Sequence, residues 1–230
     1  MVAALAAAAL IAASLPLRSG ARTPLGVFTS LPLIWNETTG PAEMIGTHAA
    51  PPWPRTALET RFRLVPLDTL LKLDRLGDLL IAQPRPLAPQ ENVALDRWVR
   101  RGGHLLLFAD PMLTAPSRFA IGDPRRPQDI ALLSPILKHW GLSLNYDEAQ
   151  PLGLREIAGS TLPINLAGHW TKRPGGEADC RIEQAGLVAN CRIGAGRALM
   201  VADAALFEAA PDPAAQAGLL HTLATKAFTR

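Results

Sequence analysis

The chain has 230 residues and a formal net charge of +3, and 48% of its residues are hydrophobic. That much apolar side chain can fill a sizeable core, so the composition excludes a disordered chain. Its basic residues are scattered rather than interleaved with aromatic residues on one face, which argues against a nucleic-acid-binding protein. Two cysteines without a CxxC pair are too few for a zinc site, and we expect neither a metal nor a cofactor.

The chain begins with a targeting or anchoring segment, because residues 1–17 carry no charged side chain. A spanning helix needs about 20 apolar residues, whereas a signal peptide has a shorter apolar run after a positive start. The run can therefore be an uncleaved anchor, a cleaved signal, a start that has lost upstream basic residues or a buried alanine-rich helix. We favour an anchor or signal over residues 1–23 and a single periplasmic domain over residues 24–230, although Arg18 and Arg22 oppose this orientation.

Short apolar runs and turn residues alternate in the next part of the chain. Residues 25–33 predict a strand, and residues 35–54 predict a long irregular loop rich in Gly and Pro. Residues 61–66 alternate between apolar and basic side chains, which is typical of a strand. Residues 67–76 predict a short helical segment.

A strand–helix–strand unit is the clearest pattern in the chain. Residues 78–82 and residues 104–109 are apolar runs of the length of buried parallel strands. Between them, a helix begins at Pro89 and carries an apolar stripe with basic residues in its last turn. Such a unit forms a parallel, right-handed crossover, with helices covering the faces of the sheet.

The second half of the chain predicts further helices and short strands. After a loop over residues 112–128, Asp129 is expected to cap a helix that runs to Trp140 and has Ile130 on its buried side. The remaining predicted elements are a strand at 142–144, short β segments within 151–172, a strand at 197–202 and a helix from Pro213 capped by Asp212.

Both cysteines fall in a predicted β-hairpin. If Ala185 and Gly186 form its two-residue turn, pairing outward places Cys180 opposite Cys191. The Cα spacing of such a cross-strand pair overlaps disulfide geometry, so we predict a bridge in an extracytoplasmic domain. Two buried free thiols are the alternative.

Polar residues stand where the predicted strands end: Ser30, Gln83, Asp110 and Asp203. Ligands of open α/β sheets bind in the crevice at the carboxyl ends of the strands, so these four residues are a candidate ligand crevice. Alternatively, the two aspartates only cap helices or turns. No catalytic residue is predicted, because neither Gln83-Pro84 nor Asp110-Pro111 supplies a nucleophile at a strand-to-helix turn.

Several stretches resemble one protein family. They are residues 78–84, 87–91, 95–103, 105–111, 139–142 and 196–207. Together they resemble the extracytoplasmic domain of GldG-like auxiliary proteins of ABC transporters. The resemblance implies a flavodoxin-like, class I glutamine amidotransferase-like three-layer α/β sandwich, with a mostly parallel sheet that the hairpin extends. It also implies permease and ATPase subunits as partners.

Three functions are consistent with these patterns. The leading hypothesis is a non-catalytic accessory domain of an ABC-type transport or gliding-like system, held at the outer face of the inner membrane by residues 1–17. The second is a hydrolase or lyase that uses Asp110 and Asp203, with or without a metal ion. The third is a sensor of a small ligand or glycan without turnover.

Overall fold

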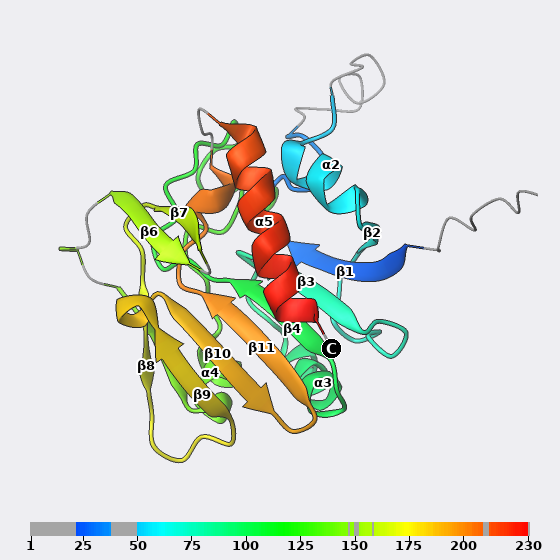
Figure 1. Cartoon of the computed structure of the whole chain (residues 1–230), viewed down its shortest axis with the longest axis vertical. Helices are drawn as coiled ribbons and strands as arrows, with labels where there is room; N and C mark the ends of the chain where they lie inside the picture. Colours follow the sequence, from blue (N-terminus) through cyan, green and yellow to red (C-terminus); the bar gives the residue numbers. More distant parts are fainter. Residues whose placement is uncertain are drawn as a thin grey trace, which may run out of the picture.

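A seven-stranded sheet with the strand order β2-β1-β3-β4-β11-β10-β9 lies at the centre of the protein (Figure 1). The computed structural model describes residues 22–37, 50–146, 148–149, 152–157, 159–208 and 212–229. The strands of the sheet are β1 (Thr23–Thr29), β2 (Phe62–Pro66), β3 (Asp78–Ala82), β4 (His104–Phe108), β9 (Asp179–Glu183), β10 (Val188–Ile193) and β11 (Gly196–Val201).

Five neighbouring strands of this sheet, from β2 to β11, run parallel, and only β10 runs against its neighbours. Every residue of β3 and β4 is buried. This is the pattern of parallel strands that are covered on both faces, and it explains their unbroken apolar sequences. The predicted α/β class and mostly parallel sheet are therefore confirmed, and the β9–β10 hairpin extends one edge of the sheet as expected.

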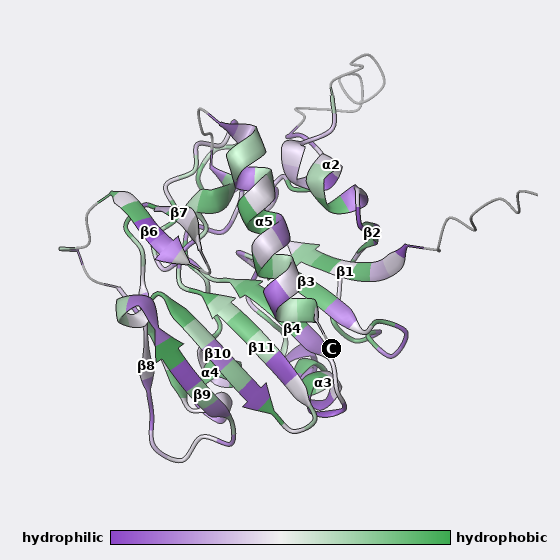
Figure 2. Cartoon of the chain, viewed as in Figure 1, coloured by the Kyte–Doolittle hydropathy of each residue, from purple (hydrophilic) through white to green (hydrophobic). Residues whose placement is uncertain are grey.

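Helices cover both faces of the sheet, which makes three layers (Figure 1). The helix α5 (Pro213–Phe228) packs on β4 and β11, and α2 (Trp53–Glu59) packs beside it. The helices α3 (Pro89–Arg100) and α4 (Ser134–Trp140) lie on the opposite face. Figure 2 shows the most hydrophobic stretches along the central strands, between these helices. The predicted crossover from β3 through α3 to β4 is confirmed.

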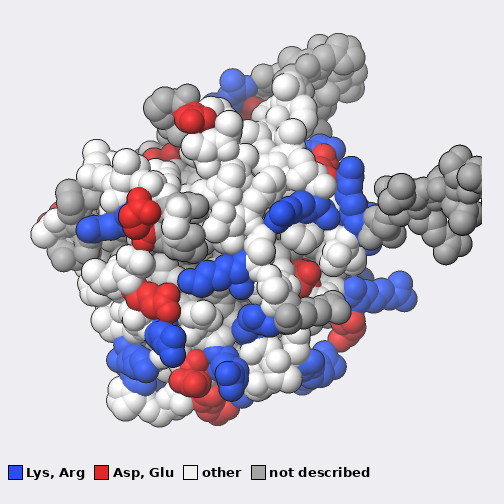
Figure 3. All heavy atoms as spheres, viewed as in Figure 1, with Lys and Arg blue, Asp and Glu red and all other residues white. Residues whose placement is uncertain are grey.

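Two small antiparallel sheets flank the hairpin. One pairs β5 (Leu142–Asn145) with β8 (His169–Lys172), and the other pairs β6 (Gly153–Ile157) with β7 (Ser160–Ile164). Single 3-10 turns complete the description: η1 (Gln184–Gly186) joins β9 to β10, and η2 (Ala205–Phe207) follows β11. On the face turned to the viewer in Figure 3, basic and acidic side chains are interspersed.

The predicted helix over residues 129–140 is too long, because α4 begins only at Ser134. Pro135 explains the difference: in a helix that began at Asp129 it would lie in the interior, where it lacks an amide donor and clashes with the preceding turn. It is instead tolerated in the first turn of the shorter helix. As a result Ile130 is about half exposed rather than buried.

The predicted helix over residues 67–76 is wrong, because this segment is an irregular loop. Leu70 and Leu73 are buried at a spacing that imitates a helical stripe. Their backbone is held by a tertiary contact instead, since the amide of Leu70 donates to Oε1 of Glu91 at 3.1 Å. Sequence reasoning also placed Trp53 in a loop, whereas it begins α2.

The first strand is shorter than predicted. It ends at Thr29, and Leu31 and Leu33 are buried from bends rather than from a strand. Residues 1–17, on which the anchor prediction depends, lie outside the described residues. Among the residues that are described, no helix is long and apolar enough to cross a membrane.

Candidate functional site

The four predicted crevice residues do come together at one edge of the sheet. Thr29, Ala82, Phe108 and Val201 end their strands at the same level of the ladder. Parallel strands present their carboxyl ends at one edge, so Ser30, Gln83, Asp110 and Asp203 follow side by side. Gln83, Asp110 and Asp203 are almost completely buried there.

Gln83 is the centre of a closed hydrogen-bond network. Its Nε2 donates to the carbonyl oxygen of Asp110 at 3.1 Å and to that of Gln128 at 2.8 Å. Its Oε1 accepts from the amide of Asp110 at 2.9 Å. The backbone of Gln83 adopts a φ of 42°, which is uncommon for a residue other than glycine. This turn aims the side chain at the loop that follows β4.

Ser30 completes this attachment of the loop. Its hydroxyl donates to the carbonyl oxygen of Gln83 and accepts from the amide of Gln128 at 2.9 Å. The hydroxyl is therefore engaged as a donor and as an acceptor. In this arrangement Ser30 and Gln83 together fix the position of Gln128, a residue that no local sequence pattern singled out.

The two aspartates accept hydrogen bonds from the backbones of three different loops. Asp110 accepts from the amides of Met112, at 2.8 Å, and Ala204, at 3.2 Å. Asp203 accepts from the amides of Asn165, at 2.9 Å, and Ala205, at 2.5 Å. In each carboxyl group one oxygen accepts from an amide two residues further along its own loop, and the other accepts from a loop that is distant in the chain.

Burial changes the protonation of both aspartates. Loss of hydration raises the pKa of Asp110 to about 6, although the two backbone donors oppose this shift. Burial, together with the negative charge of Asp110, raises the pKa of Asp203 to about 8. Asp203 is therefore mostly protonated at neutral pH, and the pair carries less negative charge than two carboxylates would.

A second polar cluster, which was not predicted, consists of Glu208, Thr114 and Asn165. Glu208 accepts from the hydroxyl of Thr114 at 2.9 Å and from Nδ2 of Asn165 at 3.3 Å. These residues lie on three separate loops, so no local sequence pattern could have connected them. Their contacts bring the loops after β4, β7 and β11 together at the carboxyl edge.

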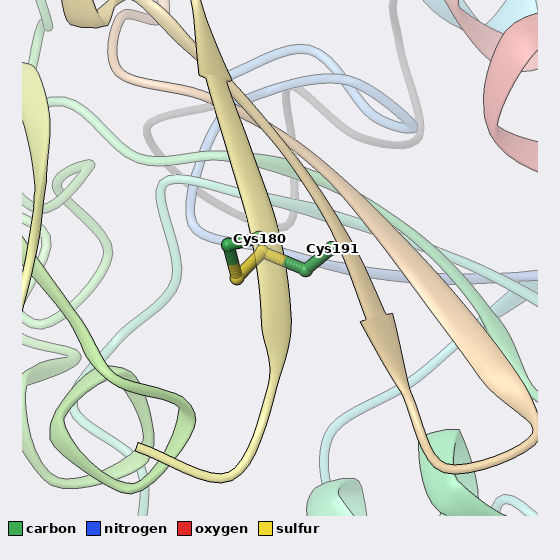
Figure 4. Close-up of a disulfide and its surroundings, with 2 residues drawn as sticks. All are labelled: Cys180 and Cys191. Carbon is green, nitrogen blue, oxygen red and sulfur yellow. A yellow bond between two sulfur atoms is a disulfide. The ribbon is translucent and has the colours of Figure 1, made fainter. Parts of the chain in front are cut away.

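The predicted disulfide between Cys180 and Cys191 is present (Figure 4). The two residues pair directly across the β9–β10 ladder, with their Cα atoms 4.0 Å apart. They are the two cysteines of the chain, and both are bonded and buried. Neither offers a thiol nucleophile in this state.

Histidines and acidic residues do not gather into a metal site in the part of the chain that the structure describes. His104, for example, contacts a single carboxylate, that of Asp78, at 3.2 Å. The arrangement of Asp110 and Asp203 also differs from a metal site, because their oxygens face backbone amide donors. Cations are coordinated by oxygen atoms that face inward to the ion.

Exposed apolar side chains mark the long loop of residues 111–133, which follows β4. Ile121 is 86% exposed and Leu132 is 53% exposed. Ile130 and Leu132 also line a pocket of about 230 Å³, together with Pro111, Leu137, Lys138, Leu142, Leu144 and Arg173. We call these three exposed residues, Ile121, Ile130 and Leu132, the apolar loop surface.

Comparison with known families gives the broader context of this surface. Residues 54–153 match the family model described as an ABC-type uncharacterized transport system. This match supports an auxiliary component of an ABC-type transport system. It contains the β3–α3–β4 unit and the whole loop of residues 111–133, whereas the β9–β10 hairpin lies beyond it. The predicted resemblance to auxiliary components of ABC transporters is confirmed, and it associates the chain with a membrane transport system.

Solved structures share the fold at low sequence identity. The exo-β-1,4-mannosidase Op5Man5 from Opitutaceae bacterium strain TAV5 has a TM-score of 0.51 and 18% identity, over 88% of this chain and 36% of the mannosidase. A catalytic mutant of the GH42 β-galactosidase Gan42B from G. stearothermophilus has a TM-score of 0.50 and 12% identity, over 89% of this chain and 30% of the galactosidase. The chain thus spans about a third of each enzyme, and the likeness concerns the fold alone. No curated protein matches the chain significantly.

Proposed function

We propose that this chain is a non-catalytic accessory domain of an ABC-type transport system, and that its apolar loop surface binds the permease subunit. The observation that carries this proposal is an exposed apolar surface on a loop that hydrogen bonds hold in place. Ile121, Ile130 and Leu132 are exposed on a loop whose two ends are hydrogen-bonded to each other directly after β4. Several exposed apolar side chains on one loop are a feature that protein-binding sites use.

Backbone contacts hold the loop at both ends. The amide of Leu113 donates to the carbonyl oxygen of Asp129 at 2.9 Å, and that of Ala131 donates to the carbonyl oxygen of Asp110 at 2.9 Å. Gln128 is held in addition by Ser30 and Gln83. Because these contacts already order the loop, a partner loses less binding free energy in ordering it.

The permease is the partner that the chemistry of this surface favours. The permease spans the membrane and can be reached from its outer face, whereas the ATPase lies on the other side of that membrane. The disulfide supports a location in the periplasm, where such bonds persist. In this proposal residues 1–17 anchor the chain at the outer face of the inner membrane.

The proposed fold is the flavodoxin-like, amidotransferase-like sandwich, in a single domain over residues 24–230. It is supported by the five parallel strands, whose order β2-β1-β3-β4-β11 has the form 2-1-3-4-5 of the flavodoxin type. The shared apolar core, which includes residues from β1 to α5, supports one domain.

The crevice of Ser30, Gln83, Asp110 and Asp203 stays a prediction as a ligand site. Its polar atoms already bind backbone groups, so a ligand would have to replace those contacts. The raised pKa of Asp203 is the observation that favours the hydrolase or lyase alternative, since shifted pKa values are common at active sites. We infer instead that the buried aspartates position the loops, because both oxygens of each are used for this purpose.

Site-specific photo-crosslinking tests the proposed permease contact. A photoreactive benzophenone amino acid is placed at Ile121 or Ile130 in cells that produce the transport system, and crosslinked products are identified by mass spectrometry. Val93 on α3 is the matched control, because it is apolar, 57% exposed and distant in sequence from the loop. We expect crosslinks to the permease from the two loop positions and none from Val93. Crosslinks from all three positions, or none to a permease, would contradict the proposal.

A further inference from the structure

Three arginines share the solvent-exposed face at the edge of the main sheet where the hairpin extends it. Arg181 lies on β9, Arg192 on β10 and Arg197 on β11. The ladder pairs Arg192 with Asp179 on one side and with Arg197 on the other. In Figure 3 basic side chains, with acidic ones among them, lie over the lower ends of these strands, and Figure 2 shows hydrophilic segments there.

These arginines surround a hollow of about 480 Å³, which is within the size range of small-molecule sites. Its lining consists of Asp179, Arg181, Asn190, Cys191, Arg192, Ala195, Gly196 and Arg197. The helix α5 covers β11 and β4 on this side of the sheet but leaves the hairpin open, apart from an ion pair at 3.5 Å between Lys226 and Glu183.

The charges of the hollow are not balanced. Within the part of the chain that the structure describes, Arg181, Arg192 and Arg197 form no ion pair, and one acidic residue, Asp179, lines the hollow. Arginines elsewhere do pair with carboxylates, namely Arg55, Arg85, Arg100, Arg101, Arg125 and Arg126. Three unpaired guanidinium groups around one concave surface attract an anion and raise its local concentration.

The disulfide holds the two hairpin arginines in register. Cys180 precedes Arg181, and Cys191 precedes Arg192, so the covalent bond lies between the strand positions that carry them. The neighbouring turn is also fixed, because the amide of Ala195 donates to the carbonyl oxygen of Arg100 at 2.9 Å. The bases of the arginine side chains are thus preorganised, which reduces the entropy lost on binding.

We propose that this hollow binds a phosphate group. A guanidinium group offers a planar fork of donors that matches two oxygens of a phosphate, and three such groups require more acceptor oxygens than one carboxylate supplies. The amide of Asn190, opposite Arg181 in the ladder, adds a neutral donor. The phosphate belongs either to a lipid headgroup or to a soluble phosphate compound, and the experiment distinguishes these sources. The inference does not depend on the proposed permease contact.

The test compares the full chain with two double variants that lose the same charge. Arg181→Gln with Arg192→Gln removes the arginines of the hollow, and Arg63→Gln with Arg75→Gln removes two exposed arginines elsewhere that form no ion pair among the described residues. Calorimetric titration with pyrophosphate in a neutral detergent measures binding to a soluble phosphate compound. Sedimentation with phosphatidylcholine vesicles, with and without phosphatidylglycerol, measures binding to a lipid phosphate.

We expect the loss of Arg181 and Arg192 to weaken binding at least ~10-fold, because each removes charge-assisted hydrogen bonds. The control variant should bind as the unmodified chain does. Weakened pyrophosphate binding indicates a soluble phosphate ligand, and a lost preference for phosphatidylglycerol vesicles indicates a lipid headgroup. Equal binding by both double variants would overturn the proposal, as would an unmodified chain that binds neither pyrophosphate nor phosphatidylglycerol, or that binds an acidic peptide in their place.

Discussion

Asp110 and Asp203 follow the adjacent parallel strands β4 and β11, and burial together with the charge of Asp110 raises the pKa of Asp203. Each of the two accepts hydrogen bonds from two backbone amides. These hydrogen bonds order the loops, although negative charges on the two carboxyl groups would repel each other. A buried carboxyl group with a raised pKa gives the protein a measurable dependence on pH.

The free energy of unfolding should decrease as the pH rises from about 4 to 8 because of Asp203. Its pKa rises from 3.8 to about 8 on folding, so the folded state binds more protons in this range. The stabilisation by protonated Asp203 is fully present below the pKa of the unfolded state. It is lost as the pH rises through the pKa of the folded state. Urea denaturation at several pH values checks this prediction.

The variant Asp203→Asn should flatten this pH dependence above pH 6, since it removes the group that titrates there, whereas Asp110, with a pKa raised to about 6, keeps part of the slope at lower pH. The substitution should also lower stability by about 1–2 kcal/mol at pH 5, because an amide cannot accept from both Asn165 and Ala205. The exposed Asp74→Asn should keep the slope of the unmodified protein. An unchanged slope above pH 6 in Asp203→Asn would show that another group causes it.

The variant Gln83→Ala should destabilise the protein by about 2–4 kcal/mol, because it leaves the buried amide of Asp110 without its acceptor and the carbonyl oxygen of Gln128 without a donor. The matched control is Gln184→Ala. Gln184 also has a positive φ, of 55°, but it is exposed in the η1 turn. Thermal unfolding and urea midpoints compare the two, and similar losses would mean that the Gln83 network contributes little.

Replacing both Cys180 and Cys191 by alanine should lower the free energy of unfolding by about 2–3 kcal/mol, because the bridge restricts the unfolded chain. Reductant should destabilise the unmodified protein in urea and leave the double variant unaffected. If reductant destabilised both equally, its effect would not come from this disulfide.

Among the charged residues on the opposite side of the sheet, Glu91 should contribute most to the free energy of unfolding. It is buried, it contacts Arg85 at 2.8 Å, and it accepts from the amides of Leu70 and Ala88. The hydrogen bond from Arg85 is the main cause that lowers its pKa to about 2. Its stabilising contribution is therefore present above pH 4.5 and should be lost as the pH falls towards 2.

The variant Glu91→Ala should cost about 2–4 kcal/mol, because it releases two backbone amides and a guanidinium group at once. Glu59→Ala is the control, since Glu59 forms a surface pair with Arg55 at 2.9 Å and should contribute less than about 1 kcal/mol. Equal effects of the two substitutions in urea denaturation would contradict this account of the loop over residues 67–76.

The sequence by itself determined the elements whose patterns are local. The apolar runs of β3 and β4 and the stripe of α3 predicted a parallel crossover, and the turn at Ala185-Gly186 predicted the pairing of Cys180 with Cys191. Because parallel strands end at one edge, the sequence also predicted that the strand-end residues would meet there.

Tertiary structure alone decided which loops those residues bind. Gln128 and Asn165 are distant in sequence from Ser30 and Asp203, and their contacts depend on how separate loops fold over the same edge. Likewise, Leu70 and Leu73 follow a helical spacing, yet the tertiary contact with Glu91 holds this segment as a loop. Local periodicity reports which side chains are buried, whereas the partner of a buried polar group depends on the whole packed chain.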